Sequence, residues 1–200
     1  MKQTLPPFPS AASPLELPLP FPSSPPATGC AASCPFTIAP ALTARLDGLA
    51  RTFDSSVQTL ALAAWAVVLA RLSTQDEFLL AGCFGTDMPV RALHLDLRGE
   101  PMLAAWLPRL DAMLRDTAAQ PGAVDLRAQA AFHLGTFALL GTETPCDVML
   151  ALAARPDGGL DGALHHAASI DAATAARWAG HVQTVLAALP DHADTPWHAL

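Results

Sequence analysis

Two adjacent histidines, His165 and His166, are the most conspicuous candidates for chemistry in this 200-residue sequence. An imidazole acts as a general base when it lies within hydrogen-bond reach of the proton that it removes. Asp171 follows a few residues later and completes the outline of a catalytic group. The pair also fits a strand, in which successive side chains point to opposite faces. We predict the strand arrangement, with no catalytic role for either histidine.

The four cysteines suggest no metal site and no disulfide framework. Cys30 and Cys34 are spaced as a ligand pair could be, but no second pair of cysteines or histidines follows at zinc-finger spacing. Cys83 and Cys146 lie in apolar stretches, where a thiol behaves as a small hydrophobic group. We expect all four to be reduced and no metal to be bound.

The segment Gly82-Cys83-Phe84-Gly85 does not have the spacing of a phosphate-binding loop. Its glycines fit the turn after a strand. Cys83 is conceivable as a nucleophile with His94 as its base, but no residue pattern orients such a base. A buried core thiol is the expected role of Cys83, and no cofactor site is predicted.

Composition excludes several classes of partner. The net charge is −7 and the 11 Lys and Arg residues are scattered, so no basic stripe could bind nucleic acid or an anionic membrane. The longest apolar run, residues 60–70, is shorter than the roughly 20 residues of a membrane-spanning helix and predicts a buried core helix. Prolines follow Lys2 in place of an apolar signal segment, so we expect a cytoplasmic protein.

Prolines divide the chain into two parts. Most of the 19 prolines fall within the first forty residues, where each ring removes a backbone donor. We therefore predict an extended, partly ordered arm over residues 1–33, in which residues 1 to about 30 are mobile and lack backbone pairing, and one folded domain over residues 34–200.

Hydrophobic periodicity predicts strands and helices in the folded part. Strands are expected at residues 34–39, 76–84, 90–97, 147–154 and 160–167. Helices are expected from Pro40 to about Phe53, from a cap at Ser55 or Ser56 through Leu72, from Pro101 to about Thr117, and from a cap at Asp171 through Leu189.

The last two strands flank turn-forming residues 155–159 and should pair as a hairpin. Residues 125–132 could form another short helix, and residues 133–144 fit either a strand or a loop. The order of elements predicts an α/β (α+β) sandwich, in which one mixed sheet is flanked by helices.

These segments, in this order, resemble condensation domains of nonribosomal peptide synthetases, which belong to the chloramphenicol acetyltransferase-like superfamily. The similar stretches are the linker-like residues 13–27, the strand and helix start at 36–46, the helix at 59–76 with its ending LARLSTQD, the segment HLDLRGEPML at 94–103, and the last helix at 169–189. Each stretch is a packing pattern, and their collinear order carries the resemblance. It implies the C-terminal half of such a domain.

Two departures from the family pattern bear on catalysis. Condensation requires a His-His-x-x-x-Asp-Gly segment, which the family carries in the N-terminal half that is lacking here. His165, His166 and Asp171 approximate it only with the aspartate displaced by one residue and alanine in place of glycine. The stretch over residues 82–95 is also shorter than in the family, which suggests that the substrate tunnel is lost.

The resemblance therefore implies a truncated, non-catalytic condensation domain that serves as an interaction or scaffold module. Its expected partner is an adenylation domain or another synthetase subunit. A split or dimeric condensation enzyme acting on carrier-bound substrates is the alternative, and a module that binds a phosphopantetheinyl carrier protein is a third possibility. A vacated groove should favour self-association, unless the arm fills it with Leu15, Leu17, Leu19 and Phe21.

Overall fold

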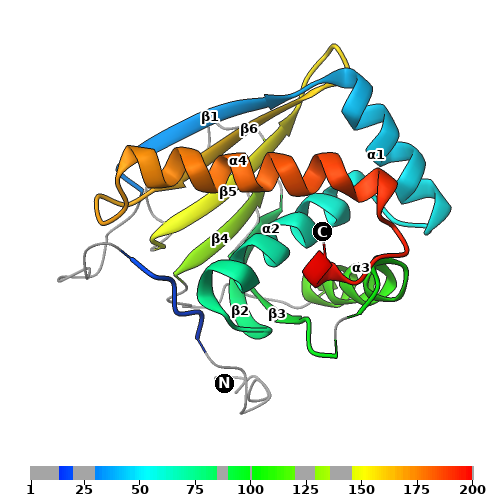
Figure 1. The fold of residues 1–200 in the computed structure, drawn as a ribbon, viewed down its shortest axis with the longest axis horizontal. Coiled ribbons are helices and arrows are strands. Elements are labelled where there is room, and N and C mark those ends of the chain that lie inside the picture. Colours follow the sequence, from blue (N-terminus) through cyan, green and yellow to red (C-terminus); the bar gives the residue numbers. More distant parts are fainter. Residues whose placement is uncertain are drawn as a thin grey trace, which may run out of the picture.

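The computed structural model describes residues 14–19, 30–84, 90–99, 101–119, 129–135 and 146–199. The strands are β1 (Ala32–Ile38), β2 (Glu77–Phe84), β3 (Arg91–Asp96), β4 (Ala130–Leu134), β5 (Val148–Ala154) and β6 (Leu160–His166). The helices are α1 (Pro40–Thr52), α2 (Val57–Ser73), α3 (Leu103–Ala119) and α4 (Ala172–Ala188), followed by 3₁₀ turns at Leu189–Asp191 and Trp197–Ala199. The strands form one mixed sheet, and α2 and α4 lie side by side across it (Figure 1). The predicted fold class is confirmed.

The strand order is β1-β6-β5-β4-β2-β3. β4 runs parallel to both of its neighbours, β2 and β5, and the other pairs are antiparallel. The predicted hairpin is present, since Ala154 of β5 pairs with Leu160 of β6. The Arg155 amide donates to the Gly159 carbonyl across the turn, and Gly158 has a φ of +84°, which glycine adopts without strain.

The central helix α2 begins at a side-chain cap. Ser56 accepts a hydrogen bond of 3.1 Å from the Thr59 amide, which satisfies one of the free donors of the first turn. Every residue from Thr59 to Ala70 is buried, so the prediction of a helix covered on nearly all sides is confirmed. Its Trp65 indole donates to the Ala131 carbonyl of β4 at 3.0 Å and so ties the helix to the sheet.

The last helix, α4, begins at the predicted cap. Asp171 accepts a hydrogen bond of 2.8 Å from the Thr174 amide. The cap holds the pKa of Asp171 below its ordinary value, because the backbone and the hydroxyl of Thr174 both donate to the carboxylate. The apolar face of α4, which includes Trp178, Val182 and Leu186, is buried in the main core.

One predicted element is wrong. The short helix expected over residues 125–132 is replaced at its end by β4, which starts at Ala130 and continues through His133 to Leu134. The first four residues of β4 are all buried, and β4 is paired on both sides. A central parallel strand shows a continuous apolar run without alternation, and a run of this length cannot be told from a helix by periodicity.

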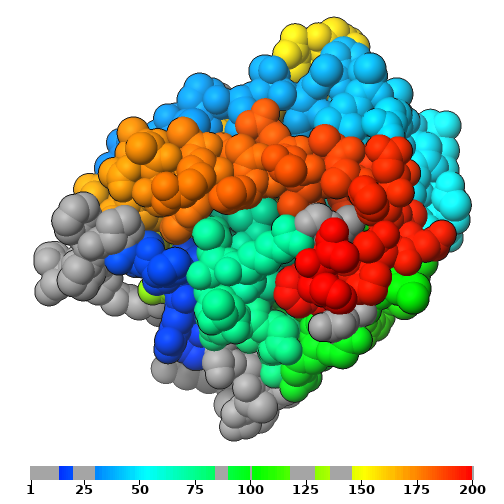
Figure 2. Space-filling view, in the orientation of Figure 1, coloured from blue at the N-terminus to red at the C-terminus, as the bar shows by residue number. Residues whose placement is uncertain are grey.

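Part of the proline-rich arm packs on the domain, which confirms that Leu15, Leu17 and Leu19 cover apolar surface but contradicts the expectation of an arm without backbone pairing. Pro14 forms a parallel bridge with Leu79 of β2, on the side that β4 takes further along the strand. The Leu15 and Leu17 side chains are 3% and 8% exposed and belong to the main core. The segment lies beside α2 in the space-filling view (Figure 2). The prediction that prolines deny the arm all backbone pairing is therefore wrong for residues 14–19.

Two glutamine side chains replace the backbone partners that the arm lacks. The Gln75 amide oxygen accepts from the Glu16 amide at 2.7 Å, and its nitrogen donates to the Pro14 carbonyl at 3.0 Å. The Gln129 amide oxygen accepts from the Leu17 amide at 2.7 Å. These bonds let a proline-rich segment dock with its polar groups satisfied. Phe21 and residues 136–144 lie outside the described residues.

Candidate functional site

The histidine pair lies on β6, as predicted, and is split between the two faces of the sheet. His166 is 5% exposed and shares a face with the core residue Leu164, and its Nδ1 lies 3.1 Å from the Ala167 carbonyl oxygen. His165 points to the opposite face, where burial first and the neighbouring His166 second lower its pKa. Asp171 is occupied as the cap of α4. The three residues therefore do not converge on one reaction centre.

Cys83 and His94 do not form a nucleophile and base. His94 of β3 pairs with Leu79 in the ladder, and its Nε2 lies 2.9 Å from the Glu77 carboxylate. The neighbour of Cys83 in the parallel ladder is His133 of β4. Gly82 lies within β2, so the expectation that it forms the turn after the strand is wrong.

The electrostatics of Cys83 and His133 oppose an ion pair. Burial raises the pKa of the Cys83 thiol. Burial, and then the nearby His165, lower the pKa of His133, which is 2% exposed. A reactive thiolate needs the reverse pair of shifts, a lowered thiol pKa beside a protonated base. Both ring nitrogens of His133 lack a hydrogen-bond partner in the described part of the chain.

The contacts of the cysteines differ from those that their spacing in the sequence suggests. Cys34 packs with the main core, whereas Cys30 packs on a second, smaller cluster formed by Ala81, Ala131, Cys146 and Met149. The Cys30 and Cys146 sulfur atoms are 4.0 Å apart. Among the described residues, no group of three or more His, Cys, Asp or Glu side chains could hold a metal ion.

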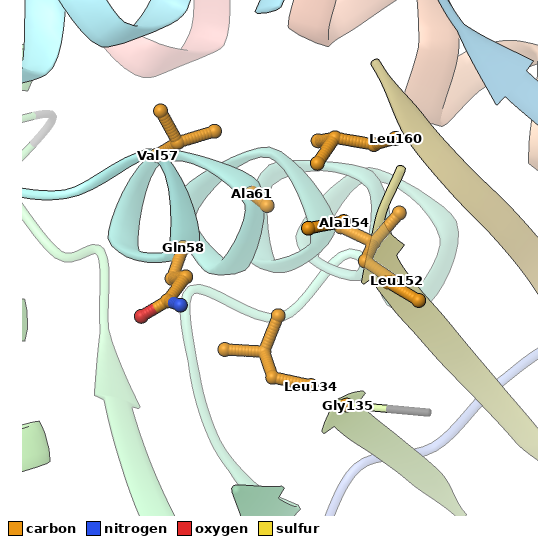
Figure 3. Close-up of a pocket in the computed structure, with 9 residues that line it drawn as sticks. Val57, Gln58, Ala61, Leu134, Gly135, Leu152, Ala154 and Leu160 are labelled. Atoms are coloured by element: carbon orange, nitrogen blue, oxygen red, sulfur yellow. The ribbon is translucent and has the colours of Figure 1, made fainter. Parts of the chain in front are cut away.

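A pocket of about 580 Å³ opens where α2 begins, beside the ends of three strands (Figure 3). Its walls are the first turns of α2, the end of β4, the end of β5 and the start of β6. The lining residues are Val57, Gln58, Ala61, Leu134, Gly135, Leu152, Ala153, Ala154 and Leu160. In Figure 3 the Ala154 and Leu160 side chains reach toward the helix.

The described walls of this pocket are aliphatic except for the Gln58 side chain. None of its nine lining residues has a titratable side chain, so the described walls offer no general base, acid or thiol nucleophile. Aliphatic walls stabilise an apolar group by removing it from water. Sequence reasoning missed the pocket because its walls come from segments about a hundred residues apart. The only local signal is Gly135, whose positive φ of +145° ends β4 at the rim.

Membrane insertion was tested on the described helices by length and composition. No single helix is long and apolar enough to cross a bilayer, whereas α1 and α2 pass the same test together as a pair bent by 99°.

No protein-family model and no curated protein matches this sequence, but solved structures match its fold. The X-domain of teicoplanin biosynthesis, in its complex with OxyB, matches with a TM-score of 0.72 and 19% identity, over 94% of this chain and 52% of that one. The condensation domain of the Monacolin K polyketide synthase MokA matches with 0.71 and 14%, over 92% and 51%. The four-domain nonribosomal peptide synthetase AB3403, in its holo form bound to AMP and glycine, matches with 0.71 and 18%, over 94% and 18%.

These matches establish the fold. The chain has the fold of condensation-like domains of nonribosomal peptide synthetases, as the sequence resemblance implied. It spans about half the length of the X-domain and condensation-domain chains, and less than a fifth of the synthetase.

Proposed function

We propose that this chain is a non-catalytic condensation-like domain that acts as an interaction or scaffold module in nonribosomal peptide synthesis. The proposal rests on one combined observation. The chain matches the fold of about half of a condensation domain, and its sequence contains no His-His-x-x-x-Asp-Gly segment. A domain that has this fold but lacks the acid-base residues of the reaction can still act through the surfaces with which it packs on other proteins.

The proposal is supported by the positions of the candidate catalytic side chains, which do not meet in one place. His165 and His166 diverge, Asp171 caps a helix, and burial disfavours a Cys83 thiolate. General base catalysis needs a nitrogen or carboxylate within about 3 Å of the proton to be moved. We infer that the described residues of the chain form no catalytic, cofactor or metal site of their own.

The proposed partner is an adenylation domain or another synthetase subunit. One structural relative, the X-domain, is known in a complex with OxyB, and another belongs to a four-domain synthetase. The aliphatic pocket at the start of α2 suits a hydrophobic side chain of such a partner better than a polar substrate. We further propose that the module works in the cytoplasm and that residues 1–33 are an arm, of which residues 14–19 pack on the domain at 34–200.

Two variants, each with one alanine replaced by phenylalanine, test the partner surface. Ala154→Phe should fill the pocket and weaken binding of an adenylation domain at least tenfold, measured by titration calorimetry on the full chain. Ala173→Phe, an equally large change at an exposed position of α4, is the matched control and should leave binding unchanged. Equal affinity of both variants for the adenylation domain would show that the pocket is not part of the interface.

The alternative, half of a split condensation enzyme, makes a different prediction. It requires a separate chain that carries the histidine segment, and addition of that chain to loaded carrier proteins should then yield condensed product. Product formation that depends on both chains would replace the scaffold function with this alternative.

A further inference from the structure

Two cysteines that are 116 positions apart in the sequence meet at the end of β6. Cys30 lies two residues before β1, and Cys146 lies two residues before β5. Both strands pair with β6 and reach the same residue, since Ala32 and Val148 are both partners of His166. Beyond that residue β6 ends, so the two flanking segments converge. Their sulfur atoms lie 4.0 Å apart, and the Cys30 sulfur is also 4.0 Å from the Cys146 carbonyl oxygen.

We propose that Cys30 and Cys146 form an oxidation-sensitive dithiol, which a peroxide converts to an intramolecular disulfide. This modification site is independent of the proposed scaffold function. A disulfide has a sulfur–sulfur distance of about 2.05 Å, so the two atoms need to approach by about 2 Å. Cys30 is half-buried and lies outside β1, so rotation of its side chain can move the sulfur without a change in strand pairing.

The other two cysteines are placed so that they do not compete. Cys34 packs against the main core on the helix-covered face of the sheet, whereas Cys30 and Cys146 share the small cluster on the opposite face. Cys83 lies in β2 beside His133 of β4. The fold therefore selects one of the possible cysteine pairs, although the spacing in the sequence would favour Cys30 with Cys34.

The two thiols of the pair differ in reactivity. A hydrogen bond from the Cys146 thiol lowers the pKa of Cys30, because it stabilises the thiolate. The same bond and then burial raise the pKa of Cys146 well above its ordinary value. Cys30 is also the more accessible of the two. Cys30 is therefore the attacking group, and Cys146 resolves the intermediate.

The reaction balances with hydrogen peroxide as the oxidant. The Cys30 thiolate attacks one peroxide oxygen, the O–O bond breaks, and the departing hydroxide takes up a proton, which leaves a sulfenic acid on Cys30 and one water. The Cys146 sulfur then attacks the Cys30 sulfur and loses its proton, and hydroxide leaves the sulfenic acid and takes up that proton as a second water. Two thiols are oxidised by two electrons, and one peroxide is reduced to two waters.

Thiol counting and peptide mapping on the full chain test the proposal. One equivalent of hydrogen peroxide should reduce the four free thiols to two, and mass mapping should find the Cys30–Cys146 cross-link as the major product. Cys146→Ser should block the cross-link and accumulate a dimedone-reactive sulfenic acid on Cys30. Cys34→Ser and Cys83→Ser are the matched controls and should leave the cross-link unchanged.

A second measurement does not depend on oxidation. A trivalent arsenical binds two neighbouring thiols at once, so phenylarsine oxide should protect Cys30 and Cys146 from maleimide and leave Cys34 and Cys83 reactive in the denatured adduct. The proposal is overturned if all four cysteines oxidise at similar rates, if Cys30 links to Cys34, or if the arsenical protects no pair. If denaturant abolishes the preference for the Cys30–Cys146 pair, that preference depends on the folded structure, which supports the proposal.

Discussion

The two faces of the sheet are built from different kinds of side chain, although neighbouring residues of the same strands supply both. The helix-covered face carries large hydrophobic groups, including Phe78, Phe132 and Leu150, none of which is exposed. The opposite face carries alanines, thiols and imidazoles, including those of Cys146 and His133. The helix-covered face therefore supplies most of the hydrophobic stabilisation, and the opposite face holds His133, His165 and the Cys30–Cys146 pair.

Adjacent residues of β4 give the sharpest test of this difference. Phe132→Ala should lower the free energy of unfolding by about 3–5 kcal/mol, because it leaves a cavity in the helix-covered core. His133→Ala should cost much less, since its ring nitrogens have no hydrogen-bond partner in the described residues and removing them relieves a desolvation penalty. Urea denaturation of both variants measures the difference. Equal losses would show that the faces contribute alike.

The arm extends the helix-covered core, so its leucines should behave as core residues. Leu15→Ala should cost about 2–3 kcal/mol, toward the lower part of the range for buried leucines, because only a short segment has to rearrange. Leu19→Ala, at a partly buried position of the same segment, is the control and should cost less than half as much. Thermal unfolding followed by circular dichroism gives both values. A Leu15 variant as stable as the parent would show that the arm does not support the core.

The imidazoles of the opposite face predict a stability that depends on pH. The pKa of His133 is lowered in the folded state, chiefly by burial, whereas the unfolded chain titrates near its ordinary value of about 6.5. The unfolded state therefore binds more protons below that pH, and stability falls as the pH drops from about 6.5 through the folded pKa. The slope contributed by this histidine is at most about 1.4 kcal/mol per pH unit.

His133→Gln should flatten that slope, measured as the free energy of unfolding between pH 7.5 and 5. The exposed His192→Gln is the control and should leave the slope unchanged. An unchanged slope in the His133 variant would mean that the opposite face does not sense pH through this group.

The smallest expected effect concerns the polar anchors of the arm. Gln75→Ala removes two hydrogen bonds to the backbone of residues 14–16 and should cost about 1 kcal/mol, since these bonds are exposed. Hydrogen exchange at the Glu16 amide should rise more than exchange at the amides of α2. Unchanged protection of the Glu16 amide would show that its hydrogen bond to Gln75 is dispensable.

The sequence predicted the helices and the hairpin because their signals are local. Ser56 precedes a long apolar run, Asp171 precedes an apolar pattern of helical period, and residues 155–159 form a turn of their own. It failed where the signal is not local. The stretch at β4 is short and shows no alternation of apolar and polar residues, so its periodicity does not distinguish a central strand from a helix. The packing of Leu15 and Leu17 was expected, but the docking of the arm's backbone was missed, because Gln75 and Gln129, far along the chain, supply its hydrogen bonds.

The candidate site was less accessible to sequence reasoning than the fold. The separation of His165 and His166 follows from the alternation of a strand and could be predicted. The pocket beside α2 and the contact between Cys30 and Cys146 depend on strand order, which no local pattern encodes.

The central claim, a condensation-like fold that interacts without catalysing, is tested most directly by a product assay. The purified full chain is incubated with loaded donor and acceptor carrier proteins, and the carrier-bound species are weighed by intact-protein mass spectrometry. We predict that the chain and its His166→Ala variant both leave the donor and acceptor unchanged. Condensed product formed by the parent and abolished by His166→Ala would contradict the account.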